Sequence, residues 1–242
     1  MSEQSALILD GVDAGYGENQ VLHDLSMDVK VGRVNCIIGP NGSGKSTSLK
    51  AMNGLVSIWD GTLEILGEDM TDATPREIVE RGIVTVPQGG NVFPEMTVKE
   101  NLRMGAYLES DSDVLAERYE HVYETFPVLR ERASQHAGSM SGGQQAMLAL
   151  GRALMADPKF LLLDEPSAGL APNLIDDVFE HLARLKDAGI DMIIVEQNVR
   201  KVLNIAEYIY ILDQGSVSFE GRKDELTDED ELVEMYLGRR ST

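Results

Sequence analysis

A short glycine-rich stretch near the N-terminus places the strongest constraint on how this chain folds. Residues 34–38 are mostly apolar and predict a buried strand, and residues 45–53 predict a helix. The segment where they meet fits the pattern G-x-x-x-x-G-K-[ST], and its residues are Gly39, Pro40, Asn41, Gly42, Ser43, Gly44, Lys45, Ser46 and Thr47. Glycines let a backbone turn tightly enough to direct successive N–H groups at one anion. The stretch therefore predicts a strand–loop–helix unit that binds the phosphates of a nucleoside triphosphate.

Two side chains of this phosphate loop carry chemistry of their own. We expect Lys45 to contact the β- and γ-phosphates and the Ser46 hydroxyl to coordinate Mg²⁺. The helix N-terminus adds unpaired N–H donors and the positive end of its dipole. The alternative is an ordinary glycine-rich turn, which the strand before it and the helix after it disfavour.

An aromatic residue precedes the phosphate loop. Residues 6–10 predict a strand that Gly11 ends, and Tyr16 then stands in a loop between Gly15 and Gly17. A tyrosine face can hold an adenine ring with little hydrogen-bond discrimination. The alternative is a loop aromatic that packs on its own sheet.

The middle of the chain is helical. From about residue 93 to residue 154 the pattern shows helical periodicity and no clear strand, which predicts a helical insertion between two strands of a sheet. One helix begins at a capping box formed by Ser141, Gly142, Gly143 and Gln144. Its two glycines leave backbone N–H groups open, which makes a second anion-binding helix end. The alternative is a well-capped helix with no ligand.

Two carboxylates follow a buried strand. Residues 160–163 form an apolar run between Pro158 and Pro166, too short for a typical helix, and Asp164 and Glu165 come directly after it. Ligands bind at the carboxyl ends of strands in parallel α/β sheets. We expect Asp164 to hold hydrated Mg²⁺ and Glu165 to polarise an attacking water. The strand at residues 192–195 delivers Gln197 to the same edge.

Composition excludes several classes of protein. The chain has 41 acidic and 21 basic residues, a net charge of −20, and this surface repels nucleic acid. The acidity reflects either ordinary solvated faces or, as we favour, a cytosol of high salt. The single cysteine, Cys36, excludes an internal disulfide and lies in a predicted core strand. No apolar run is long enough to span a membrane, and residues 1–6 lack the pattern of a secretory signal.

Taken together, these segments resemble the ATPase subunit of ABC transporters over essentially the whole chain. The most discriminating segment is residues 141–144, because other phosphate-loop enzymes lack it. Residues 140–144, 165–172 and 195–198 are similar to one subclass, the second ATPase subunit of branched-chain amino acid importers, and Tyr236, Leu237 and Gly238 agree with it.

The resemblance implies a fold and a domain organisation. It implies an α/β fold with a phosphate-loop NTPase core, a mixed, largely parallel sheet, an N-terminal antiparallel β part and an inserted helical subdomain. We expect one ABC ATPase domain over residues 1–242, with a nucleotide-binding core at residues 1–89 and 155–242 and the helical subdomain at about residues 90–154.

The resemblance also implies a mechanism and partners. Two ATPase subunits meet head to tail, and residues 141–144 of one contact the ATP held by the phosphate loop of the other. Gln88 senses Mg²⁺ and the attacking water, and residues 91–94 help to form a groove for a permease subunit. The ATPase therefore works at the cytoplasmic face of the membrane, bound to permeases and served indirectly by an extracytoplasmic substrate-binding protein.

One residue departs from the general family pattern. Gln197 stands where the family has a histidine that contacts the γ-phosphate and water. Glutamine donates and accepts hydrogen bonds but cannot carry a proton. We hypothesise that Gln197 positions the water while Glu165 acts as the base. Three alternative functions stay open: an importer of urea or short amides, a soluble ABC ATPase outside transport, and a regulatory nucleotide-binding module. The sequence also leaves open whether the working dimer is a homodimer or a heterodimer.

Overall fold

The computed structural model describes residues 5–225, and this part of the chain forms two compact units. The first comprises residues 5–81 and 191–225, and the second comprises residues 82–190. The predicted division into a core of residues 1–89 and 155–242 and a helical subdomain of about residues 90–154 stays a prediction. Tyr236, Leu237 and Gly238, which agreed with the importer subclass, lie outside the described residues.

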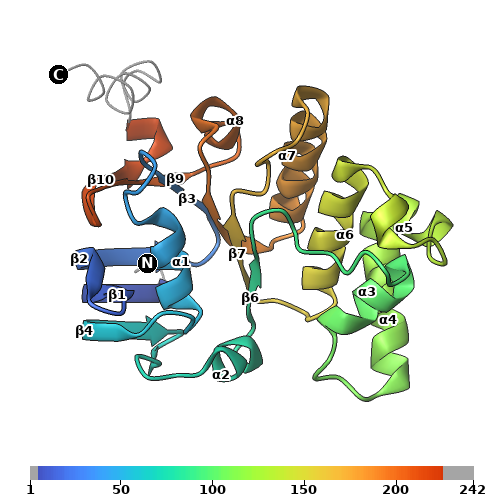
Figure 1. Cartoon of the computed structure of the whole chain (residues 1–242), viewed down its shortest axis with the longest axis horizontal. Coiled ribbons are helices and arrows are strands. Elements are labelled where there is room, and N and C mark those ends of the chain that lie inside the picture. Colours follow the sequence, from blue (N-terminus) through green and yellow to red (C-terminus); the bar gives the residue numbers. More distant parts are fainter. Residues whose placement is uncertain (1–4, 226–242) are drawn as a thin grey trace. The chain divides into compact units, whose positions relative to one another are not determined.

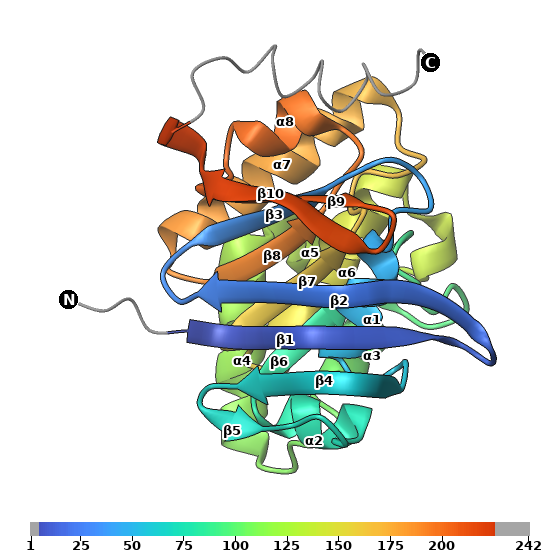
Figure 2. The same ribbon diagram turned by 90° about the vertical axis from the view of Figure 1, so that its left-hand side faces the viewer.

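The N-terminal part of the first unit is an antiparallel sheet (Figure 2). Its strands follow the order β2 (Asn19–Lys30), β1 (Ser5–Tyr16), β4 (Ile58–Ile65) and β5 (Glu68–Asp69). Side chains alternate along the central strand, so that Leu7 and Leu9 are buried while Asp10 is exposed. This alternation gives the sheet one apolar face against the core.

Gly11 does not end the first strand, and that prediction is wrong. Strand β1 continues to Tyr16, and its pairing with β2 shifts register between Leu9 and Val12. Gly11 adopts a φ of 60°, a conformation that glycine accepts without steric cost. The glycine therefore accommodates a β-bulge rather than a break. Tyr16 is the last residue of the strand, paired with Asn19, and not a loop residue.

A second set of strands in the first unit lies on both sides of β3 (Val34–Ile38), as Figure 2 shows. Strands β8 (Asp191–Val195) and β9 (Tyr208–Asp213) pair with β3 in parallel, and β10 (Ser216–Arg222) pairs antiparallel with β9. Every residue of β3 is buried, as the apolar run predicts. Cys36 is fully buried there, and burial raises the pKa of its thiol. The helices of this unit are α1 (Lys45–Met52), α2 (Pro75–Glu80) and α8 (Val199–Leu203), with a 3₁₀ turn at Lys223–Glu225.

The second unit contains two parallel strands. Most of its helices lie in the stretch of chain that connects these strands. Strands β6 (Ile83–Val86) and β7 (Phe160–Asp164) align Val86 with Leu163. The helices are α3 (Val98–Gly105), α4 (Ser112–Thr125), α5 (Pro127–Glu131), α6 (Gly142–Leu154) and α7 (Pro172–Asp187), with a 3₁₀ turn at Ala137–Ser139. The predicted α/β fold with parallel strands, an N-terminal antiparallel sheet and a helical insertion is confirmed. Among residues 5–225, no helix is long and apolar enough to cross a membrane.

Helix α6 is the centre of the helical segment. A Cβ at Gly151 would lie 2.9 Å from Leu129 of α5, 3.1 Å from Val122 of α4 and 3.2 Å from Leu102 of α3. These three side chains are fully buried. The missing side chain at Gly151 thus lets three helices pack closely on one point of α6.

Candidate functional site

The phosphate loop lies between β3 and α1, as the sequence predicts (Figure 1). Gly42 and Gly44 have φ values of 83° and 100°, which residues with a Cβ rarely adopt. The N–H of Ser43 donates to the carbonyl of Pro40 over 3.1 Å and closes the turn. The glycines therefore give the loop a curvature that the pattern requires for surrounding an anion.

Lys45 reaches back over this loop. Its Nζ donates to the carbonyl oxygens of Gly39 and Pro40 over 2.8 and 3.0 Å, and the residue is 5% exposed. A buried ammonium group is stable only where hydrogen bonds compensate for the lost water. The loop thus holds one positive charge at its inner side, where it can meet phosphate oxygens.

The N-terminus of α1 differs from those of α2 and α3. Helices α2 and α3 begin with Thr–Glu capping boxes, whereas α1 has Gly44 at its N-cap and no acidic residue in its first turn. The positive end of its dipole is therefore not neutralised by a carboxylate of its own first turn. The buried hydroxyl of Ser43 has no hydrogen-bond partner within the described residues. Both observations fit a loop built to receive a phosphate group.

Tyr16 contacts the same helix. Its ring is 45% exposed, and its hydroxyl accepts a hydrogen bond of 3.2 Å from Lys50 Nζ. The ammonium also lies 5.4 Å from the ring centroid. Lys50, in the last turn of α1, was missed by the sequence analysis, because no pattern links it to Tyr16. An exposed aromatic ring fixed beside the phosphate-loop helix is suited to stack on a base.

Gln197 follows β8 on a segment that one carboxylate organises. Oε2 of Glu196 accepts from the N–H groups of Gln197 and Asn198 over 3.0 and 3.2 Å, and Glu196 is 2% exposed. The side chain of Gln197 is exposed. Glu196 thus fixes the backbone from which Gln197 extends. The sequence analysis assigned no role to Glu196; a carboxylate directly after an apolar strand was the available signal.

In the second unit, the ends of β6 and β7 bring two predicted site residues together. Gln88 Nε2 donates to Glu165 Oε2 over 3.0 Å. Glu165 is 8% exposed and has a φ of 46°, a left-handed conformation that is uncommon outside glycine. Asp164 ends β7 directly before it. Strained backbone geometry of this kind clusters at functional sites, where surrounding contacts hold it in place.

The capping box at the start of α6 has the predicted geometry. Ser141 Oγ accepts from the N–H of Gln144 over 3.4 Å, and Gln144 Oε1 accepts from the N–H of Ser141 over 3.2 Å. A Cβ at Gly143 would lie 2.9 Å from Leu174 Cδ2, and one at Gly142 would lie 3.3 Å from Leu170 Cδ2. Both glycines therefore also serve close packing, and the cap is uncharged.

The predicted site residues fall into both units. The phosphate loop, Tyr16 and Gln197 belong to the first unit, and Gln88, Asp164, Glu165 and residues 141–144 belong to the second. The structure brings Gln88 and Glu165 into contact within the second unit. The joint binding of Mg²⁺ by Ser46, Gln88 and Asp164 stays a prediction. Their hydroxyl, amide and carboxylate oxygens are the donors that Mg²⁺ prefers.

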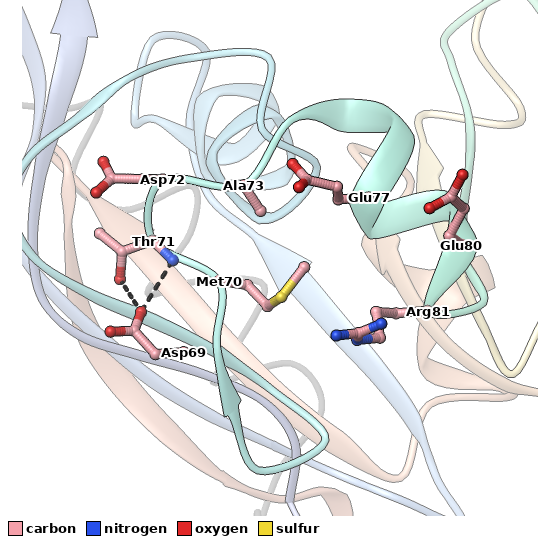
Figure 3. Close-up of a pocket in the computed structure, with 8 residues that line it drawn as sticks. All are labelled: Asp69, Met70, Thr71, Asp72, Ala73, Glu77, Glu80 and Arg81. Carbon is pink, nitrogen blue, oxygen red and sulfur yellow. Dashed lines mark hydrogen bonds between the residues drawn. The ribbon is translucent and has the colours of Figure 1, made fainter.

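A separate pocket of about 470 Å³ in the first unit has the opposite character (Figure 3). Carboxylates line it from both sides, together with Arg81; they are Asp69, Asp72, Glu77 and Glu80. Hydrogen bonds from Thr71 lower the pKa of Asp69, and hydrogen bonds from Thr74 lower the pKa of Glu77. Asp69 and Glu77 also accept hydrogen bonds from the backbone N–H groups of Thr71 and Thr74, and the negative charge of the four carboxylates disfavours a phosphate ligand.

Comparisons with known proteins agree with this geometry. Residues 22–168 match the family model described as ABC transporter. The chain is 41% identical over 232 residues to the high-affinity branched-chain amino acid transport ATP-binding protein BraG of Pseudomonas aeruginosa, which covers 96% of this chain and 99% of that protein. It is 36% identical over 228 residues to the probable branched-chain amino acid transport ATP-binding protein LivF of Archaeoglobus fulgidus, with coverages of 94% and 96%.

The fold is also similar to that of a solved structure. The crystal structure of the ADP conformation of an ATP-binding cassette of an ABC transporter superposes with a TM-score of 0.84 at 32% identity. The match covers 97% of this chain and 99% of that one. The chain thus belongs to the ABC transporter family, as a nucleotide-binding ATPase of that family.

Proposed function

We propose that this chain is the ATP-hydrolysing subunit of an ABC importer for branched-chain amino acids. The observation that carries the hydrolytic part is the contact between Gln88 and the strained, nearly buried Glu165, placed directly after Asp164. The near-full-length similarity to two relatives named for branched-chain amino acid transport supports the cargo class.

Binding of ATP rests on the phosphate loop. Backbone N–H groups of the loop and of the first turn of α1 would surround the phosphates, and Lys45 would leave its loop carbonyls for the β- and γ-phosphate oxygens. Tyr16, fixed by Lys50, would stack on the base. Mg²⁺, held through Ser46, Gln88 and Asp164, would offset the charge that develops on the phosphates.

Hydrolysis rests on Glu165. The hydrogen bond from Gln88 and the left-handed backbone orient its carboxylate, which would accept a proton from the attacking water. Gln197 would position that water through its amide, because its backbone is held by Glu196 while its side chain is exposed. Glutamine cannot take up the proton, so Glu165 stays the base.

The start of α6 would complete a partner's site. Its uncharged cap and paired glycines present a helix N-terminus that can receive a γ-phosphate. We infer a head-to-tail pair of ATPase subunits, docked on permease subunits at the cytoplasmic face of the membrane and served by an extracytoplasmic binding protein. The second candidate cargo is urea or a short amide, and the relatives' names favour branched-chain amino acids.

Phosphate release by the purified full-length chain in ATP and Mg²⁺ tests the hydrolytic part. Lys45→Ala should reduce turnover to background. Lys30→Ala is a matched control, because Lys30 pairs with Asp28 at the end of β2. Equal rates for the wild type and Lys45→Ala would refute hydrolysis at this site.

Uptake by membrane vesicles from the source cell tests the cargo. Replacing the chain by its Lys45→Ala variant should abolish ATP-dependent uptake of labelled leucine and leave urea uptake unchanged. Loss of urea uptake with intact leucine uptake would reverse the assignment, and unchanged uptake of both would place the chain outside these importers.

A further inference from the structure

A second feature of α6 lies three turns beyond its cap. Arg152 donates through its two terminal nitrogens to the carbonyl oxygens of Gly90 and Asn91, over 2.7 and 2.8 Å. The same guanidinium lies 5.3 Å from the centroid of the Phe93 ring. Burial lowers the pKa of Arg152, so the carbonyls and the ring replace water around this charge. Helix α6 thereby contacts residues 90–93 through the side chain of Arg152.

This segment is directly joined to Gln88. The N–H of Gly90 donates to the carbonyl of Pro87 over 2.9 Å and closes a tight turn that contains Gln88. A Cβ at Gly90 would lie 2.7 Å from the Cβ of Ala149, so the turn rests directly on α6. Gln88 in turn donates to Glu165. A continuous path of contacts therefore runs from α6 through Arg152 and the turn to the carboxylate.

The turn also has room to move. A cavity of about 220 Å³ lies beside it, with walls from the turn, α6 and the loop after β7; they include Gly89, Gly90, Ala146, Ala149, Pro166 and Gly169. Gly89 and Gly90 have φ values of 72° and 68°, a left-handed conformation that glycine adopts without steric cost. The two hydrogen bonds from Arg152 hold Gly90 and Asn91 against α6, whereas the buried amide of Asn101 holds the backbone of Phe93 at the far end of the segment.

We propose that Arg152 is a positioning residue that couples the N-terminal contact of α6 to the Gln88–Glu165 pair. A displacement of α6 at Ser141–Gln144 would be carried along the rigid helix to Arg152 and from there to the Gln88 turn. Closure around a partner's nucleotide would thus tune hydrolysis in the chain's own site. This role rests on the function proposed above for Glu165 and for the start of α6.

The test compares R152Q with a matched control, R118Q. Arg118 of α4 also donates to a backbone carbonyl at the end of α6, that of Met155, over 3.0 Å, but does not reach the Gln88 turn. Hydrogen–deuterium exchange of the full-length chain without nucleotide measures how well the backbone amides around Gln88 are protected. R152Q should exchange the amides of residues 88–92 several-fold faster than the wild type, and R118Q should leave them unchanged. The N–H of Phe93 donates to Asn101 Oδ1 and should keep its protection in both variants. Equal exchange in R152Q and R118Q would overturn the proposal.

Steady-state kinetics with ATP and Mg²⁺ read the coupling. R152Q should lower kcat by roughly 10- to 100-fold, because a small misplacement of a catalytic group has effects of this size. KM should stay within about twofold, since the phosphate loop is untouched. The proposed coupling between two nucleotide sites makes the wild-type rate depend cooperatively on ATP, and R152Q should lose that cooperativity. R152K should recover part of kcat, because lysine can bond one carbonyl at a time. It also keeps the comparison possible if R152Q fails to fold.

Two failures are distinguishable. A wild type that hydrolyses ATP, with R152Q retaining kcat and cooperativity, would refute the coupling role alone. A wild type that hydrolyses no ATP would refute the proposed function, and the coupling role, which rests on it, would fall with it.

Discussion

Replacing Gly39 by alanine tests whether the phosphate loop depends on close contact with β9. A Cβ at this position would lie 2.3 Å from the carbonyl oxygen of Leu212 and 2.5 Å from Ser43 Oγ, whereas real Cβ contacts do not fall under 3.0 Å. The carbonyl belongs to a strand whose Ile211 is paired with Ile38, the residue before Gly39. Because neither strand can retreat without losing ladder hydrogen bonds, the loop must shift.

The expected cost follows from the rigidity of these neighbours. Overpacking a well-packed site costs about 1–3 kcal/mol, and we expect about 3 kcal/mol where the obstacle is backbone. For a domain of this size, each kcal/mol lowers Tm by roughly 2–4 °C. Gly39→Ala should therefore lower Tm by roughly 6–12 °C.

Gly67→Ala provides the matched control. Gly67 has a φ of 85°, and a Cβ there would have no atom within 4 Å. Its substitution costs only the left-handed backbone conformation, about 1 kcal/mol. We expect a decrease in Tm of roughly 2–4 °C, with the phosphate loop undisturbed.

Thermal unfolding with and without ATP and Mg²⁺ separates the two variants. A ligand at a hundred times its Kd stabilises the folded state by about 2.7 kcal/mol. The wild type and Gly67→Ala should therefore gain roughly 5–11 °C in Tm, and Gly39→Ala should gain clearly less. The steric argument would be refuted by a Gly39→Ala variant that has the same Tm as Gly67→Ala and shows the full increase in Tm with ATP and Mg²⁺.

Three further predictions concern other positions. Glu165→Gln should lower kcat by roughly 10²- to 10⁴-fold while the gain in Tm from ATP persists, and loss of that gain would show that Glu165 acts in binding. Gln197→His should leave turnover within a few-fold in the same assay; a loss as deep as that of Glu165→Gln would contradict its positioning role. Burial lowers the pKa of His181 below 6.5, so the unfolded chain binds the proton more readily and stability falls as pH drops from 6.5 towards the folded pKa. His181→Phe, which keeps a ring against Phe126, should flatten the free energy of unfolding in this window, and an unchanged pH dependence would contradict the assignment.

Sequence analysis is most accurate for features that depend only on residues close together in the chain, such as helix caps. The capping box at Ser141 has the predicted geometry, because a cap and its partner lie three residues apart, and the same spacing gives the boxes at Thr74 and Thr97. Gly11 shows the limit of local reasoning. A glycine accommodates a bulge as readily as a break, and pairing with β2 and β4 on both sides decides between them.

Contacts between distant residues could not be read from the pattern. The bond between Gln88 and Glu165 spans 77 positions and depends on the parallel register of β6 with β7. The positive φ of Glu165 is likewise invisible, since glutamate carries no local signal for it. The contact of Lys50 with Tyr16 joins a helix to a strand end that sequence analysis had placed in a loop.

The buried position of Cys36 has a practical consequence for spectroscopy. It is the single cysteine of the chain, it is inaccessible to solvent, and its raised thiol pKa keeps it protonated at neutral pH. Thiol-specific dyes should therefore not react with the native chain. A cysteine introduced at an exposed position such as Ser134 would be the sole reactive thiol. Single-site fluorescent labelling thus needs one substitution and no removal of a native residue.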